Sequence, residues 1–142
     1  INEFCEIKHI PIGAIELIAT APLAKAYKDA EQLHQVMCNL MENAWHYSDK
    51  NATTQLIQVI LASNENEISI DISDNGEGIT EAVQQHLFEP FHSQRTGGTG
   101  LGLYLARVLC QANGARLNYL PDEKERCCFR INVPLDWQES VQ

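Results

Sequence analysis

One amphipathic stripe limits what this chain can fold into. Between Asp29 and Ser48, apolar residues recur every three or four positions, the period of an α-helix with one buried face. Asp29 stands where a helix N-cap is expected. The spacing therefore predicts a helix over Asp29–Ser48 whose apolar face must be covered by another element. The stripe consists of Leu33, Val36, Met37, Leu40, Met41, Ala44 and Tyr47.

Alternating residues predict strands after this helix. Between Glu67 and Ser73, isoleucine occupies every second position and polar residues occupy the others. The turn composition of Ser63–Asn66 makes this strand the second half of an antiparallel hairpin. The predicted strands are Thr54–Ala62, Glu67–Ser73, Ala115–Leu120 and Cys127–Val133, and Glu6–Leu17 has the composition of a further strand or hairpin.

Two more helices complete the expected fold. Thr80 is the predicted N-cap of a short helix over Glu81–Leu87, and a longer helix covers Leu101–Ala112, with Asn113-Gly114 as its C-terminal stop. Hairpins and helices in this order predict an α+β fold, a sandwich with helices on one face of a sheet. The 142 residues, 44% of them hydrophobic, match one domain, so 1–142 is read as a single unit.

Charge and composition exclude several classes of function. Ten basic against 19 acidic residues give a net charge of -9, which argues against nucleic acid binding. No apolar run reaches the roughly 18 residues that cross a bilayer, and no signal peptide is visible. Five cysteines without a C-x-x-C pair indicate reduced thiols in the cytosol. Ile1 in place of an initiator Met leads us to expect a fragment of a longer protein.

Glycine is concentrated in one part of the chain. Six of the eight glycines lie within the 27 residues from Gly76 to Gly102. The run Gly97–Leu103 leads directly into a predicted helix, so its N–H groups and the positive end of the helix dipole suit an anionic phosphate. It is not a P-loop, because no Gly-Lys-Ser/Thr follows, and not a dinucleotide fingerprint, because no strand directly precedes it. Close packing alone is the alternative explanation.

Two polar clusters can each be explained either by ligand binding or by ordinary surface structure. The segment Asp74–Ile79 ends a strand beside two glycines and either places a carboxylate at the bottom of a pocket or forms a solvated turn. Asn39, Asn43 and His46 share one flank of the first predicted helix. An asparagine carbonyl oxygen is a hard ligand suited to Mg²⁺, whereas the alternative is an ordinary polar helix face.

In their order along the chain, these segments resemble the N, G1, F and G2 boxes of bacterial sensor histidine kinases. The resemblance is to their catalytic and ATP-binding domain, within the GHKL superfamily that includes type II topoisomerase, heat-shock and mismatch-repair ATPases. It implies a mixed sheet with three helices on one face. Residues 88–118 further resemble kinases that control type IV pilin expression. The four segments are Asn39–Ala44, Asp74–Gly78, Phe88–Phe91 and Gly98–Leu103, within a resemblance that runs from about Ala30 to Pro134.

The resemblance implies a Mg-ATP site. Asn43 would coordinate Mg²⁺ at the ATP phosphates, and Asn39 would assist at the phosphates or the metal waters. Asp74 would accept a hydrogen bond from the adenine 6-amino group. Gly76 and Gly78 would let the base approach the backbone, Tyr47 would stack on it, and Gly100, Leu101 and Gly102 would donate N–H groups to the phosphates. Ile79, Phe91 and Thr99 would also bind the nucleotide.

The same resemblance implies a mobile lid that Phe88 and Phe91 anchor and that runs to about Thr99. Arg95 is its only full cation and is the candidate for a γ-phosphate contact, with an exposed loop cation as the alternative. His46 stands where many family members carry Lys or Arg toward the phosphates, so its contact would be weaker or pH-sensitive.

Asn39 also bears on the type of reaction. Hydrolases of the superfamily usually carry Glu at this position, and an amide cannot act as a general base at neutral pH. We therefore expect a protein-histidine kinase that acts on a helical dimerisation domain outside this chain, because none of the five histidines has an acceptor context. The parent kinase would act on a response regulator, and this domain would be cytoplasmic without touching nucleic acid or membrane. The alternatives are an ATP-binding regulatory module without kinase activity and a GHKL-type ATPase.

Overall fold

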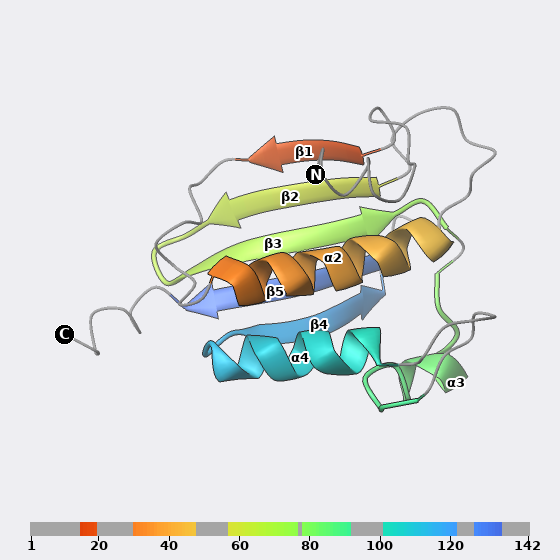
Figure 1. Ribbon diagram of the computed structural model, residues 1–142. Coiled ribbons are helices and arrows are strands. Elements are labelled where there is room, and N and C mark those ends of the chain that lie inside the picture. Colours follow the sequence, from red (N-terminus) through yellow and green to blue (C-terminus); the bar gives the residue numbers. More distant parts are fainter. Residues whose placement is uncertain are drawn as a thin grey trace.

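The computed structural model describes residues 15–19, 30–47, 57–76, 78–91, 101–121 and 127–134. These residues form a five-stranded mixed sheet in the order β1-β2-β3-β5-β4, with helices α2 and α4 on one face (Figure 1). β1 pairs in parallel with β2, and the other neighbouring strands are antiparallel. The elements are β1 (Ile15–Ala19), α2 (Ala30–Tyr47), β2 (Ile57–Ser63), β3 (Glu67–Asp74), α3 (Glu81–Gln84), α4 (Gly102–Ala112), β4 (Arg116–Pro121) and β5 (Cys127–Pro134). The α+β prediction is confirmed.

The element boundaries follow the sequence pattern closely. α2 and α4 confirm the two long helices, although the expected cap Asp29 lies outside the described residues. α3 is shorter than predicted, because hydrogen bonds of the i+3 type replace the helical pattern after Gln84. The Thr80 cap is confirmed, since its Oγ1 accepts from the Val83 N–H at 3.4 Å. Of the strand or hairpin expected over residues 6–17, only the part from Ile15 is described, and it lies in β1.

The core lies between the sheet and the two longer helices. The stripe of α2 buries Val36, Leu40, Met41 and Ala44 against the alternating isoleucines of β3. α2 and α4 also pack on each other, so the two helices form one layer over the sheet. None of the helices within the described ranges has both the length and the apolar character needed to cross a bilayer.

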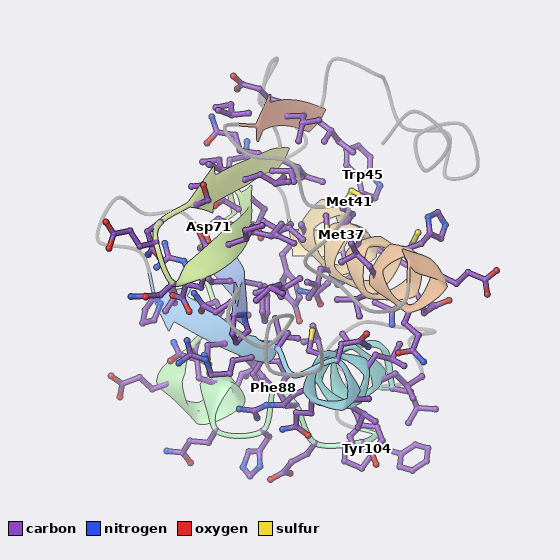
Figure 2. The ribbon with its side chains drawn as sticks, turned by 90° about the vertical axis from the view of Figure 1, so that its left-hand side faces the viewer. Met37, Met41, Trp45, Asp71, Phe88 and Tyr104 are labelled. Atoms are coloured by element: carbon purple, nitrogen blue, oxygen red, sulfur yellow. The ribbon has the colours of Figure 1, made fainter. Side chains whose placement is uncertain are left out.

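The other face of the sheet is polar. Figure 2 shows Asp71 on the side of β3 that faces away from α2 and α4. Its carboxylate accepts two hydrogen bonds from Arg130 of β5, at 2.6 and 2.7 Å. This bond raises the pKa of Arg130 above its ordinary value, so the guanidinium remains charged. The predicted alternation of β3 is therefore confirmed on both faces.

The two ends of the sheet have different structures. At one end, the C-terminus of α2, the end of β3 and the N-terminus of α4 lie together (Figure 1). At the opposite end, a tight turn joins β2 to β3, and Asn64 Oδ1 accepts from the N–H groups of Asn66 and Glu67 at 2.8 and 2.9 Å. The described residues that were expected to bind a ligand, apart from Phe91, belong to the first end or to the segments that lead into it.

Candidate functional site

Asp74 is a buried carboxylate at the end of β3. Its side chain is only 1% exposed, and Ile57 and Cys127 of the neighbouring strands lie on either side of it in register. Oδ1 accepts a hydrogen bond from the Gly76 N–H at 2.8 Å. Burying a carboxylate without hydrogen bond donors destabilises the fold. The bond from Gly76 therefore holds the turn after β3 against Asp74. The alternative of a turn with a solvated Asp74 side chain is wrong, because Asp74 is buried, and its place at the bottom of a pocket stays a prediction.

Gly76 is required by the fold itself. A Cβ atom at this position would lie 2.0 Å from the carbonyl oxygen of Tyr47 and 3.0 Å from its carbonyl carbon. No side chain fits there, because the loop after β3 rests directly on the last residue of α2. Gly78 is required for a different reason, since its φ of +91° lies in the left-handed region. The two glycines together fix the path of the loop between Asp74 and Ile79.

Aromatic residues support the end of this loop at Ile79. The Tyr119 hydroxyl accepts a hydrogen bond from the Ile79 N–H at 3.3 Å. The Tyr119 ring packs edge-on against Phe129, which also contacts Phe88. The Arg107 guanidinium of α4 lies 4.3 Å from the centre of the Phe88 ring, and Figure 2 shows Phe88 beside α4. Sequence reasoning found neither Tyr119 nor Arg107, because no local motif marks them.

We expect Tyr119→Phe to lower both the stability of the chain and its affinity for ATP, because the loop after β3 loses a hydrogen bond. The loss of one hydrogen bond acceptor for Ile79 lowers the free energy of unfolding by about 1 kcal/mol. Urea unfolding and calorimetric titration with ATP measure the two effects. Tyr104→Phe is the matched control, because Tyr104 lies exposed on α4 and points away from the sheet (Figure 2). Equal ATP affinity in the two variants would show that the Tyr119 hydroxyl does not position the loop.

The two asparagines of α2 have different surroundings. The Asn39 Nδ2 donates to the Gly102 carbonyl oxygen at 3.1 Å. Asn43 lies one turn later, and its Nδ2 is buried without a hydrogen bond partner among the described residues. An unpaired buried donor costs about 1–3 kcal/mol, which a ligand oxygen that accepts a hydrogen bond from it would offset. His46 is exposed at the end of the same helix, with its ring edge-on to that of Tyr47.

The N-terminus of α4 has no side-chain cap. Leu101 occupies the N-cap position and provides no side-chain hydrogen bond to the helix. A Cβ atom on Gly102 would meet no atom of the described residues within 4 Å, so none of their packing contacts requires glycine there. Backbone N–H groups and the helix dipole make such an end suitable for an anion.

The remaining predicted site residues are Phe91, Arg95, Thr99 and Gly100. Phe91 is 77% exposed and has a φ of +67°, whereas Phe88 packs against Phe129, and the nucleotide and lid roles expected for these residues stay predictions. Arg95, Thr99 and Gly100 lie outside the described residues. The other predicted residues belong to α2, to the end of β3 with the loop after it, and to the start of α4, which contacts join through Asn39 and Gly102 and through Gly76 and Tyr47: Asn39, Asn43, His46, Tyr47, Asp74, Gly76, Gly78, Ile79, Leu101 and Gly102.

The candidate site offers few protein ligands for a metal ion, so a hard cation there would take further oxygen ligands from a bound nucleotide. Across the described ranges, no cluster of three or more His, Cys, Asp or Glu side chains is placed to bind a metal. Asn43 offers an amide oxygen, the type of ligand that Mg²⁺ accepts while it keeps water and substrate phosphates. The residues therefore fit a magnesium ion that takes its other oxygens from a nucleotide and from water.

The chain is similar to known proteins over most of its length. Residues 28–136 match the family described as histidine kinase-, DNA gyrase B-, and HSP90-like ATPase. The sensor protein kinase PilS of Pseudomonas aeruginosa is 35% identical over 125 residues, which is 87% of this chain and 22% of PilS. The mycobacterial sensor histidine kinase MprB has the same fold, with a TM-score of 0.71 at 20% identity over 94% of this chain and 90% of that one. Full-length ShkA in complex with AMPPNP aligns with a TM-score of 0.73 at 21% identity, over 94% of this chain and 28% of ShkA.

Proposed function

Because the chain belongs to the family of histidine kinase-, DNA gyrase B- and HSP90-like ATPases, we propose that it binds Mg-ATP and transfers the γ-phosphoryl group to a histidine of a separate helical domain. The observation that carries the proposal is a grouping of three features at one end of the sheet: a buried carboxylate, an asparagine whose buried Nδ2 has no partner among the described residues, and a helix N-terminus without a side-chain cap. These three groups suit the base, the metal and the phosphates of one nucleotide.

Each group has a defined task. Asp74 accepts a hydrogen bond from the adenine 6-amino group, while its Oδ1 remains bonded to Gly76. Asn43 holds Mg²⁺ through its amide oxygen, and the ion neutralises charge on the phosphates. The N–H groups at the start of α4 bind phosphate oxygens, with Gly102 leaving room for them. Arg95 contributes a positive charge at the γ-phosphate, as the sequence predicts.

The reaction is a phosphoryl transfer. The bond from the γ-phosphorus to the β–γ bridging oxygen breaks, a bond to an imidazole nitrogen forms, ADP leaves, and the imidazole proton passes to solvent. Asn39 cannot act as a base for water, and its amide is engaged with Gly102, so nothing at this position activates hydrolysis. PilS is named as a sensor protein kinase, and ShkA was solved with AMPPNP, which supports both nucleotide binding and transfer.

The proposal extends to partners that this chain does not contain. The chain spans 22% of the length of PilS, so a longer kinase would supply the dimerisation domain and act on a response regulator. The resemblance of residues 88–118 to pilin-regulating kinases and the identity to PilS point to the same branch of kinases.

Labelled ATP tests the transfer directly. The chain is incubated with Mg²⁺ and γ-labelled ATP, with and without the helical dimerisation domain of its parent kinase. We expect acid-labile phosphate on the helical domain only. Binding without transfer would identify a regulatory ATP-binding module instead, and rapid phosphate release by the chain alone would identify an ATPase.

We expect Asp74→Asn to erode the preference for adenine. Asparagine retains an oxygen that can accept from Gly76, so the fold persists, but its amide N–H₂ faces the adenine amino group. Losing this charge-assisted bond costs about 1.5–3 kcal/mol of ATP binding, while GTP, whose base has an acceptor there, gains. Calorimetry with ATP and GTP measures the ratio. Asp71→Asn, on the opposite face of the same strand, is the control. An unchanged ratio in a folded Asp74→Asn variant would refute the adenine contact.

A further inference from the structure

The side-chain amide of Asn39 connects two helices. Its Nδ2 donates to the Gly102 carbonyl oxygen at 3.1 Å, across 63 positions of sequence. Its Oδ1 accepts from Gln35 Nε2 at 2.9 Å, one turn earlier on α2. Both ends of the amide are therefore bound within the chain, whereas Asn43, one turn later, has a buried Nδ2 without a partner among the described residues.

These two contacts allow only one orientation of the Asn39 amide. The Gly102 carbonyl only accepts, so the group that faces it must be a donor, the Nδ2 of Asn39. Oδ1 then faces Gln35 and needs a donor in turn, which Nε2 supplies. A hydrogen bond acceptor at position 35 would favour an Asn39 amide turned by 180°, with Nδ2 toward position 35. The Asn39 Oδ1 would then face the Gly102 carbonyl oxygen, and both atoms only accept. The exposed Gln35 thus influences a contact on the inner side of the helix.

The contact is made at a functionally sensitive place. Gly102 is the first residue of α4, and Asn43 lies four residues after Asn39 on α2. The Asn39 contact therefore relates the phosphate-binding end of α4 to the metal-binding side chain of α2. The hydrogen bond therefore fixes the distance between the N-terminus of α4 and Asn43, the two groups that we assign to one triphosphate.

We propose that Asn39 is a positioning residue, and that Gln35 and Asn39 form an amide relay that holds the N-terminus of α4 in place beside Asn43. The inference rests on the proposed function, because the relay matters for nucleotide binding only if α4 and Asn43 bind one nucleotide. It assigns Gln35 a role in the site although Gln35 lies outside every sequence motif. It also separates the tasks of the two asparagines: Asn39 holds the helices, and Asn43 meets the ligand.

Variants at the exposed position 35 test the relay without touching the nucleotide. Gln35→Lys keeps a donor toward Asn39 Oδ1, and Gln35→Glu replaces it with an acceptor. Both residues favour helix, so both variants should fold. Gln35→Glu should increase hydrogen exchange at the Leu105 and Ala106 amides of nucleotide-free protein and weaken Mg-ADP binding about tenfold. Gln35→Lys should leave amide exchange as in the parent chain, and the uncharged Gln35→Ala should fall between the two.

Asn39 variants separate positioning from metal binding. Asn39→Asp keeps a hard oxygen for Mg²⁺ but cannot donate to Gly102, so a positioning role predicts the same faster exchange and a similar loss of Mg-ADP affinity. In an Asn39→Ala background, Gln35→Glu should cause no further change in exchange. Unchanged exchange in Gln35→Glu, or Asn39→Asp with normal exchange and normal Mg-ADP affinity, would overturn the relay. If the parent chain failed to bind Mg-ADP, the proposed function would fail while the exchange data still tested the relay.

Discussion

Gly76→Ala is expected to be the most damaging single substitution in the described part of the chain. The added Cβ would lie 2.0 Å from the Tyr47 carbonyl oxygen, and a backbone atom at the end of a packed helix cannot move aside. Either α2 or the loop after β3 must shift, and both carry groups of the candidate site. We expect a loss of about 3 kcal/mol or more in the free energy of unfolding, with loss of detectable ATP binding. Urea unfolding and calorimetry measure both.

Gly102→Ala is the matched control for this effect. Its Cβ would meet no atom of the described residues within 4 Å, and alanine favours helix over glycine by about 0.8–1.0 kcal/mol, so the variant should be as stable as the parent or slightly more stable. Its nucleotide affinity should still fall if phosphate occupies the position of that Cβ. Equal stability losses in the two variants would mean that the Tyr47 contact does not explain the glycine at position 76.

Asn43→Ala should have the largest effect on function among the substitutions that leave the fold intact. The amide oxygen that we assign to Mg²⁺ disappears, so the dependence of ATP binding on Mg²⁺ should vanish, phosphoryl transfer should stop, and Mg-ATP affinity should fall about 100-fold. The nucleotide-free chain should not suffer, because the variant removes a buried donor that has no partner among the described residues. Calorimetry with and without EDTA and thermal unfolding without nucleotide separate these effects.

Asn43→Asp completes the comparison. It keeps a hard oxygen, so some Mg²⁺ dependence should persist, although the added negative charge weakens the binding of ATP. Normal phosphoryl transfer by Asn43→Ala would show that this residue belongs to a passive helix surface. A marked loss of stability in the same variant would show that its amide supports the fold.

The elements of this fold were predictable wherever one face of a helix or strand is buried. α2 and β3 have the periods of 3.6 and 2 that such burial imposes, and they appeared at the expected positions within a residue or two. Phe88 and Phe91 show the limit of this reasoning. Both belong to the same short motif, yet Phe88 packs against Phe129 and Phe91 is 77% exposed. Only the path of the backbone distinguishes them.

Contacts between distant segments were beyond sequence reasoning. The motif order pointed to Gly76, but the need for glycine arises from Tyr47, which lies 29 positions earlier on another element. Tyr119 supports Ile79 from 40 positions away, through a hydroxyl that no pattern marks. Sequence periodicity reports which face of an element is buried, whereas these contacts depend on how the elements come together in space.

The turn between β2 and β3 is a suitable place to insert a fluorescent protein that would report nucleotide binding to this domain. The turn lies at the end of the sheet opposite Asp74 and the start of α4 (Figure 1), and Glu65 at its tip is exposed. An insertion after Glu65 separates Asn64 from Asn66 and Glu67 and removes their hydrogen bonds, but lengthening a surface loop itself costs only about 0.6 kcal/mol for each doubling, so a fluorescent protein inserted there should leave the nucleotide end intact. β3 runs from this turn to Asp74 without interruption, so one strand would link the inserted fluorophore to the buried carboxylate.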